Sequence, residues 1–369
     1  MSLQKQIEDI ADTIKDALNI GPKSVVGVDI GMHSIKVAEV QMLAENSFKL
    51  VRYATVQLPE AAIIEDEIQK LDDIVECLKE ALESSQISLK AACLGLSGPN
   101  TIARKLQLVG GSSEEELEDQ VMWEAEQYLP FGLFESSIAF DVVGENEGGG
   151  VDVIVAAARN DTLESFKEIV ELAELKAKIV DLSVLAFVNV FDHVKQELHE
   201  STASSYILID IGAQKMDFVI FKNNSISFTK QMNIGCVMIT EEIQRQLGVN
   251  YKEAEDLKIT GDENGNLPEE ILEIIDDVVE SFFSEIKKTL DFYVTSTSDD
   301  SFDGCYVTGG GTLIPGLLEG LEALLGVKVE VLNPFEKITF DKNIPQSQIN
   351  DIAYKGLVAL GLGMRQLRE

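Results

Sequence analysis

One narrow apolar stripe runs along the start of the chain. Its members recur at steps of three and four residues, which predicts an amphipathic helix over residues 1–22 that ends at the Gly21-Pro22 pair. The stripe consists of Leu3, Ile7, Ile10, Ile14 and Leu18. Because acidic side chains prevail on the other faces, an anionic membrane is a poor match. We expect the stripe to pack either on its own domain or on a partner, with self-association as one such case.

From Ser24 the apolar period changes to two, and strands and helices then alternate through the first half of the chain. Residues 24–40 predict a β-hairpin. The segments that follow predict a helix at 65–84, two short strands within 89–109, a helix from the serines at 112 and 113 to Pro130, strands at 137–143 and 151–158, and helices at 161–174 and 183–199. A serine followed by carboxylates is typical of a helix N-terminus.

The second half of the chain repeats the opening of the first. Residues 25–40 read VVGVDIGMHSIKVAEV and residues 206–221 read YILIDIGAQKMDFVIF, so each has a strand ending in Asp-Ile-Gly, a turn and a second strand. The small polar stretch 200–205 is the best candidate boundary between the halves. Two such hairpins in a chain of 369 residues indicate a duplication.

The charge of the chain narrows its possible partners. It has 64 acidic and 30 basic side chains and a net charge of −34. A field this negative repels phosphate backbones and anionic headgroups, which excludes unspecific nucleic-acid binding. No apolar run has the length of a membrane span, the start lacks a signal-peptide core, and the four cysteines form no CxxC pair. We expect a reduced, cytoplasmic protein with no nucleic-acid partner and no direct membrane insertion.

The two Asp-Ile-Gly hairpins suit a phosphate chain and its metal ion. A glycine lets the backbone approach a phosphate and leaves turn amides free to donate. A carboxylate at the strand end repels phosphate unless hydrated Mg²⁺ lies between them, so Asp29 and Asp210 are candidate magnesium ligands through water. Candidate phosphate contacts are Gly31, Met32, His33, Ser34 and Lys36 in the first hairpin and Gly212, Ala213, Gln214 and Lys215 in the second. One such hairpin alone is ordinarily structural, and His33 is alternatively an exposed turn residue.

Two later segments add candidate nucleoside contacts. Residues 306–317, YVTGGGTLIPGL, run from an apolar strand through glycines to a helix, where a flat group can lie against the backbone. Residues 250–258, NYKEAEDLK, place a Glu and a Lys one helical turn apart, which suits a ribose. The candidates are Gly309, Gly310, Gly311, Thr312, Glu255 and Lys258. Taken alone, the glycines also suit a structural turn and the Glu-Lys pair a solvated surface pair.

In chain order these pieces, with Gly235 as a further nucleotide-contact candidate, resemble the actin-like ATPase superfamily, which includes FtsA, MreB, heat-shock chaperones and sugar kinases. Within it, the sequence is similar to the PilM family of type IV pilus assembly from about residue 24 onward. The resemblance implies an α/β protein with a two-lobed actin-like ATPase fold, made of duplicated RNase H-like domains, and an FtsA-type 1C subdomain. The implied subdomains are 1A from 23–87, 179–200 and 351–369; 1C from 88–178; 2A from 201–250 and 304–350; and 2B from 251–303.

The resemblance also implies a function. Members of this family bind ATP with Mg²⁺ between their lobes and hold the cytoplasmic N-terminal tail of a PilN-like inner-membrane protein in a groove between 1A and 1C. They link the membrane alignment complex to the motor, so pilus motor ATPases are further candidate partners. The implied place is the cytoplasmic face of the inner membrane, reached through the partner. The groove falls within the stretch from Leu94 to Phe131.

Two departures from the superfamily pattern bear on catalysis. Met216 and Asp217 stand where the second hairpin often has a threonine, and Ser183 stands where many members place the Glu or Gln that positions the attacking water. Serine is a poor general base, so we expect slow hydrolysis at most. Trp123 has two interpretations, core packing or partner contact. An FtsA-like filament protein and a small-molecule kinase remain alternative functions.

Overall fold

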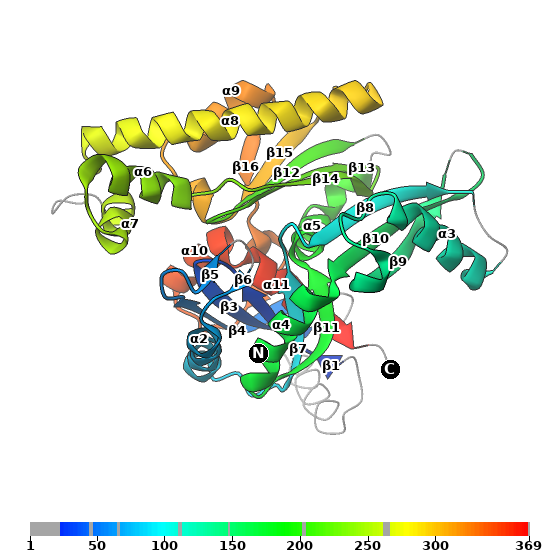
Figure 1. The fold of residues 1–369 in the computed structure, drawn as a ribbon, viewed down its shortest axis with the longest axis horizontal. Helices are drawn as coiled ribbons and strands as arrows, with labels where there is room; N and C mark the ends of the chain where they lie inside the picture. Colours follow the sequence, from blue (N-terminus) through cyan, green and yellow to red (C-terminus); the bar gives the residue numbers. More distant parts are fainter. Residues whose placement is uncertain are drawn as a thin grey trace, which may run out of the picture.

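The computed structural model describes residues 23–43, 47–64, 67–109, 113–146, 148–200, 204–260 and 266–367. These residues form two lobes, each built on its own β-sheet, and a smaller unit beside them (Figure 1). The predicted N-terminal helix 1–22 lies outside the described residues. Within the described ranges, no helix combines the length and apolarity that crossing a membrane requires.

The first lobe contains a six-stranded sheet in the order β11-β7-β2-β3-β4-β17. Its strands are β2 (Val26–Ile30), β3 (Ser34–Met42), β4 (Phe48–Gln57), β7 (Ala91–Leu96), β11 (Lys176–Leu182) and β17 (Thr339–Phe340). β2 is antiparallel to β3 and parallel to β7. Its side chains are mostly buried, as expected for a strand that is covered on both faces.

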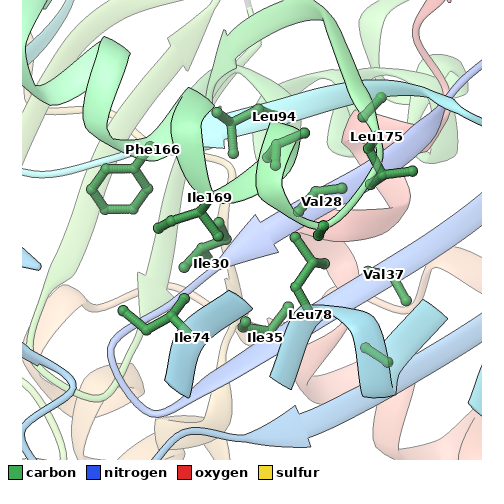
Figure 2. Packing of buried hydrophobic residues seen from close by; sticks show 14 of the residues in the cluster. Val28, Ile30, Ile35, Val37, Ile74, Leu78, Leu94, Phe166, Ile169 and Leu175 are labelled. Carbon is green, nitrogen blue, oxygen red and sulfur yellow. The ribbon is translucent and has the colours of Figure 1, made fainter. Parts of the chain in front are cut away.

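Helices cover both faces of this sheet. Helices α2 (Leu71–Ser85) and α4 (Asn160–Leu172) pack on one face, and Figure 2 shows Ile74, Leu78 and Ile169 meeting the apolar side chains of β2 and β3. Helices α5 (Ser183–Val194) and α11 (Leu357–Gly363) pack on the other. A Cβ at Gly27 would lie 2.1 Å from the carbonyl oxygen of Ala359. Only glycine therefore lets α11 approach the strand that carries Asp29.

The second lobe repeats this arrangement. Its sheet has the order β14-β13-β12-β15-β16, from β12 (Ser205–Ile211), β13 (Met216–Lys222), β14 (Ser225–Met232), β15 (Gly304–Thr308) and β16 (Val329–Val331). β12 is antiparallel to β13 and parallel to β15, the same pairing that β2 makes. Its helices are α6 (Val237–Leu247), α7 (Tyr251–Thr260), α8 (Glu269–Thr297) and α9 (Leu317–Leu325). The long α8 runs across the sheet (Figure 1) and shares its apolar core.

The smaller unit is a three-stranded antiparallel sheet with one helix. Strands β8 (Thr101–Leu108), β9 (Ser136–Glu145) and β10 (Val151–Arg159) lie in the order β8-β10-β9. Helix α3 (Glu114–Glu126) packs on one face through Val121, and the Ser113 hydroxyl caps its N-terminus. β8 also lies beside β14, where the Thr229 hydroxyl donates to the Ala103 carbonyl oxygen. The unit therefore contacts the second lobe.

Short elements complete the described fold. Helix α10 (Gln346–Lys355) packs against α11 and against the segment after β15. Two-residue strands pair as β1 (Lys23–Ser24) with β18 (Gln366–Leu367) and as β5 (Ile63–Ile64) with β6 (Glu67–Ile68). Single 3-10 turns are η2 (Leu133–Glu135), η3 (Gln196–Glu200), η4 (Gly310–Leu313) and η5 (Pro334–Glu336).

Several predicted boundaries differ from the observed ones. The helix expected at 65–84 begins at Leu71, since β6 precedes it. The helix expected to reach Pro130 ends at Glu126, and the one expected to reach 199 ends at Val194. Strand β11 was not predicted, because its alternating Lys-Ala-Lys start also suits a solvated loop.

The separate three-stranded unit spans fewer residues than the 88–178 expected for subdomain 1C. β7 joins the sheet of the first lobe and α4 packs on that sheet, whereas β8 leaves for the separate three-stranded sheet. The strands expected at 89–109 therefore form no hairpin. We propose that subdomain 1C comprises residues 101–159. The remaining subdomain limits stay predictions, although β17, which falls in the span expected for 2A, pairs with β4 of the first lobe.

Candidate functional site

A cleft of about 590 Å³ lies between the two lobes. Its walls come from both Asp-Ile-Gly hairpins, helix α7, the glycines after β15 and the end of α10. The residues singled out from the sequence that line it are Asp29, Gly31, Met32, His33, Ser34, Lys36, Asp210, Gly212, Ala213, Gln214, Lys215, Glu255, Lys258, Gly309 and Gly310. The fold thus brings together segments that are far apart in the chain.

The two hairpin turns have the same backbone geometry. The Gly31 amide donates to the Ser34 carbonyl oxygen (3.1 Å), and the Gly212 amide donates to that of Lys215 (2.9 Å). Within the described chain, the amides enclosed by these turns donate to no backbone oxygen: those of Met32 and His33 in the first turn and of Ala213 and Gln214 in the second. Such amides are donors for an anion, and here both sets border one cleft.

Asp29 and Asp210 hold equivalent positions with different neighbours. Each is the next-to-last residue of the central strand of its lobe. Asp29 is paired in register with Lys36, whose Nζ lies 3.1 Å from its Oδ2. Asp210 is paired with Asp217, which accepts a hydrogen bond from Gln231 at 2.9 Å. The first hairpin therefore neutralises its carboxylate, and the second places two acids opposite each other.

Asp210 is suited to a cation. Burial raises its pKa to about 7, and Asp217 and Asp29 add to the rise. A Cβ at Gly309 would lie 2.5 Å from Oδ1 of Asp210, and the φ of +91° there also requires glycine. Among the described residues, no group of three His, Cys, Asp or Glu could hold a metal directly. A cation here would therefore keep most of its water, as Mg²⁺ commonly does.

Glu255 and Lys258 form a partly buried polar cluster. Lys258 Nζ donates to Glu255 Oε2 at 2.6 Å and to the Thr240 hydroxyl at 2.8 Å, and that hydroxyl donates to Oε2 at 2.6 Å. Burial raises the pKa of Glu255, but Lys258 and these hydrogen bonds outweigh burial and hold it below its usual value. The interpretation of the pair as solvated is therefore wrong. These contacts also join α7 to α6.

His33 is not an exposed turn residue. It is half-buried, and burial lowers its pKa against the attraction of Glu255 in the second lobe. A histidine of the first turn thus lies near the polar cluster on the opposite wall.

Three residues that were predicted to contact the nucleotide do not line the cleft, but they pack against segments that do. A Cβ at Gly235 would lie 2.5 Å from the Ala213 carbonyl oxygen, and one at Gly311 would lie 2.1 Å from the Ile211 side chain. The buried Thr312 hydroxyl donates to the Gly309 carbonyl oxygen at 2.7 Å. These residues shape the second turn and the glycine segment.

Other lining residues were not among the candidates. They include Thr55, Gln57, Ser97, Cys236, Tyr251, Ile259, Leu313, Asp351 and Lys355, together with Ser183 and Asp217 of the departures named above. Ile259 and Leu313 are exposed apolar side chains, 65% and 52% accessible. Large exposed apolar groups inside a cleft indicate surface that a ligand covers.

The small unit carries exposed aromatic side chains, one of them beside its contact with the first lobe. Asn160, the first residue of α4, donates to the Phe134 carbonyl oxygen and accepts from the Ser137 hydroxyl, and Phe134 is fully exposed. Tyr128 is covered on one face by the Arg104 guanidinium, 3.6 Å from the ring centre. Trp123 on α3 is 65% exposed, so its interpretation as a core residue is wrong.

The whole chain can be compared with known proteins. Residues 27–367 match the family described as type IV pilus assembly protein PilM. A solved PilM–PilN type IV pilus biogenesis complex is similar at 26% identity and a TM-score of 0.82, over 94% of this chain and 99% of that one. The ethanolamine utilization protein EutJ from Carboxydothermus hydrogenoformans shares the fold at 15% identity and a TM-score of 0.55, over 96% and 98%. This chain therefore belongs to the PilM family of type IV pilus assembly proteins.

Proposed function

We propose that this protein is an ATP- and Mg²⁺-binding adaptor that recruits the cytoplasmic N-terminal tail of a PilN-like inner-membrane protein. The observation that carries the nucleotide half is the pair of matching turns on one cleft, each with amides that donate to no backbone oxygen in the described chain. The partner half is supported by similarity to a PilM–PilN complex over nearly the whole chain. This adaptor acts on the cytoplasmic face of the inner membrane, which it reaches through its partner.

The residues of the cleft fit a magnesium nucleotide. The two turns would donate to phosphate oxygens from both lobes, and Asp29 and Asp210 would hold the metal through its water. Asp210 faces Asp217 across β12 and β13, so two like charges there would be balanced by a bound cation. Bound Mg²⁺ supplies the charge that lets carboxylates and phosphates share one cleft.

The nucleoside fits the part of the cleft that is lined by α7 and by the segment after β15. Gly309 and Gly310 offer bare backbone there, and Ile259 and Leu313 offer apolar surface to a base. Glu255 and Lys258 present polar atoms to a ribose. The residue that borders the cleft at position 183 is a serine, whose hydroxyl is a much weaker general base than a carboxylate or an imidazole. Slow hydrolysis therefore stays our prediction.

The partner tail binds between the small unit and the first lobe. The small unit carries exposed aromatic residues of the kind that dominate interface energies, Trp123, Tyr128 and Phe134, and Phe134 lies beside the first lobe at Asn160. The net charge of −34 favours a tail that carries basic residues beside its apolar ones.

A synthetic peptide of the PilN homologue's cytoplasmic tail tests the partner site. Its affinity for the full chain is measured by fluorescence anisotropy, and Phe134→Ala and Trp123→Ala are each expected to weaken it about tenfold or more. The control is Phe292→Ala, which removes from α8 of the second lobe an aromatic ring that is as exposed as Trp123. Failure of the wild-type chain to bind the tail, or equal losses in all three variants, contradicts the site.

A further inference from the structure

Four lysines line the cleft, and the lysine–carboxylate ion pairs there differ in how deeply they are buried. They are Lys36, Lys215, Lys258 and Lys355. Lys36 pairs with Asp29, Lys258 pairs with Glu255, and Lys215 also has an interaction within the protein. Lys355, at the end of α10, pairs with Asp351 one turn earlier at 2.9 Å.

Exposure separates these ion pairs. The Lys36–Asp29 and Lys258–Glu255 side chains are 14% or less accessible, whereas those of Lys355 and Asp351 are 43% and 33%. Removing the lysine from a buried pair strands a carboxylate away from water, which is costly. An exposed pair within one helix contributes little, so its lysine can exchange partners almost freely. Of Lys36, Lys258 and Lys355, Lys355 is therefore the one that can leave its carboxylate partner for a ligand at the smallest cost in free energy.

The backbone places Lys355 beside the metal end of the cleft. The carbonyl oxygen of the preceding residue, Tyr354, accepts from the Gly309 amide at 2.9 Å. Gly309 is the residue that lies against the Asp210 carboxylate. Lys355 is also close enough to His33 in the first turn to lower its pKa. A flexible four-carbon side chain at this point starts beside Gly309 and can extend toward the first turn.

We propose that Lys355 is a phosphate-binding residue that makes the cleft select nucleoside triphosphates over nucleotides with fewer phosphates. This inference rests on the proposed function, since it assumes that a nucleotide occupies the cleft. On binding, Lys355 leaves Asp351 and donates to the outer phosphates. Its ammonium then adds a charge-assisted hydrogen bond that AMP, which lacks those phosphates, does not make.

Isothermal titration of ATP, ADP and AMP in Mg²⁺ tests this role in the full chain. Lys355→Ala is expected to weaken ATP binding about tenfold or more and to leave AMP binding within about twofold of wild type. Lys355→Arg keeps most of the preference, because the charge and donors remain. Asp351→Asn does not weaken ATP binding, since Lys355 loses only a competing partner. Lys288→Ala is the control, because it removes an exposed helical ion pair with Glu285 outside the cleft.

The outcomes separate the two proposals. If wild type binds no nucleotide, the proposed nucleotide function fails, and the role of Lys355 fails with it. If wild type binds ATP and Lys355→Ala keeps the same ratio of ATP to AMP affinity, only the role of Lys355 is overturned. Equal unfolding midpoints of the variants in urea show that any loss is local to the cleft.

Discussion

Two aspartates at equivalent positions acquire different properties from their neighbours. The strand partner of Asp29 is a lysine, whereas that of Asp210 is a second aspartate. Burial with a like charge disfavours the ionised form of Asp210, so its pKa is raised to about 7. A cation bound beside Asp210 would favour its ionised form again, in line with the metal role that we propose for it. The duplicated hairpins thus differ: one pairs its carboxylate with a lysine, and the other pairs it with a second acid.

The stability of the protein in EDTA should depend on the protonation of Asp210. For an acid whose pKa is raised by folding, the unfolded chain releases its proton first, so the contribution of Asp210 to the unfolding free energy is largest below about pH 4 and falls until about pH 7. The full loss is at most about 4 kcal/mol. Asp210→Asn should remove this component of the pH profile, measured by urea unfolding from pH 4 to 8.

The matched control is Asp141→Asn, which neutralises an exposed carboxylate on β9. This variant should keep the slope of the wild-type profile. A profile of Asp210→Asn that is parallel to wild type over the whole range would rule out a raised pKa at Asp210.

At the scale of elements, the central hairpins were predicted correctly because their burial leaves a strong signal. β2 is an apolar run interrupted by Gly27 and Asp29, and β12 is apolar after Ser205 except for Asp210. β11 escaped prediction because its exposed Lys176 and Lys178 break the apolar pattern at the edge of the sheet. The separation of β7 from β8 follows from tertiary packing, which adjacent short strands do not reveal.

The same contrast holds for the site. Glycines and aspartates in the two hairpins have a local pattern, so they were predicted as candidates. Ile259 and Lys355 have none: each is an ordinary helical residue until the fold places it in the cleft. The exposure of Trp123 also follows from which face of α3 meets the small sheet, where Val121 is buried instead.

The cluster between α6 and α7 should be sensitive to the loss of one partner. Lys258→Met leaves Glu255 buried without its cation, which should cost about 3–5 kcal/mol of unfolding free energy in urea at pH 7. The double variant Glu255→Gln, Lys258→Met should recover much of that loss, because no charge is then buried alone.

Lys288→Met is the control, because its pair with Glu285 is exposed and its loss should change the unfolding free energy by less than about 0.5 kcal/mol. Similar small effects of Lys258→Met and Lys288→Met would show that the cluster does not join the two helices as we describe.

In the whole molecule, the two proposed sites, the nucleotide cleft and the site for the partner tail, lie on parts that contact each other. The cleft lies between the lobes, and the small unit contacts the first lobe at Asn160 and the second lobe at Thr229. The small unit, which carries the exposed aromatic residues, therefore contacts both lobes. This arrangement suits an adaptor in which one ligand influences another, since both bias the same rigid parts.

The claim that a magnesium nucleotide joins the lobes has one direct test. ATP binding in Mg²⁺ is measured by isothermal titration for wild type and for the Asp29→Ala, Asp210→Ala double variant. Simple charge repulsion predicts that removing two carboxylates strengthens the binding of an anion. Our account predicts the reverse, a loss of about tenfold or more, because the metal loses its ligands.

A second double variant controls for net charge. Asp276→Ala, Asp277→Ala removes two exposed carboxylates from α8 and should leave ATP affinity unchanged. We predict that EDTA abolishes ATP binding by the wild type, and that the Asp29, Asp210 double variant binds ATP weakly even in Mg²⁺. Wild-type ATP affinity retained by that variant in Mg²⁺ would contradict the account.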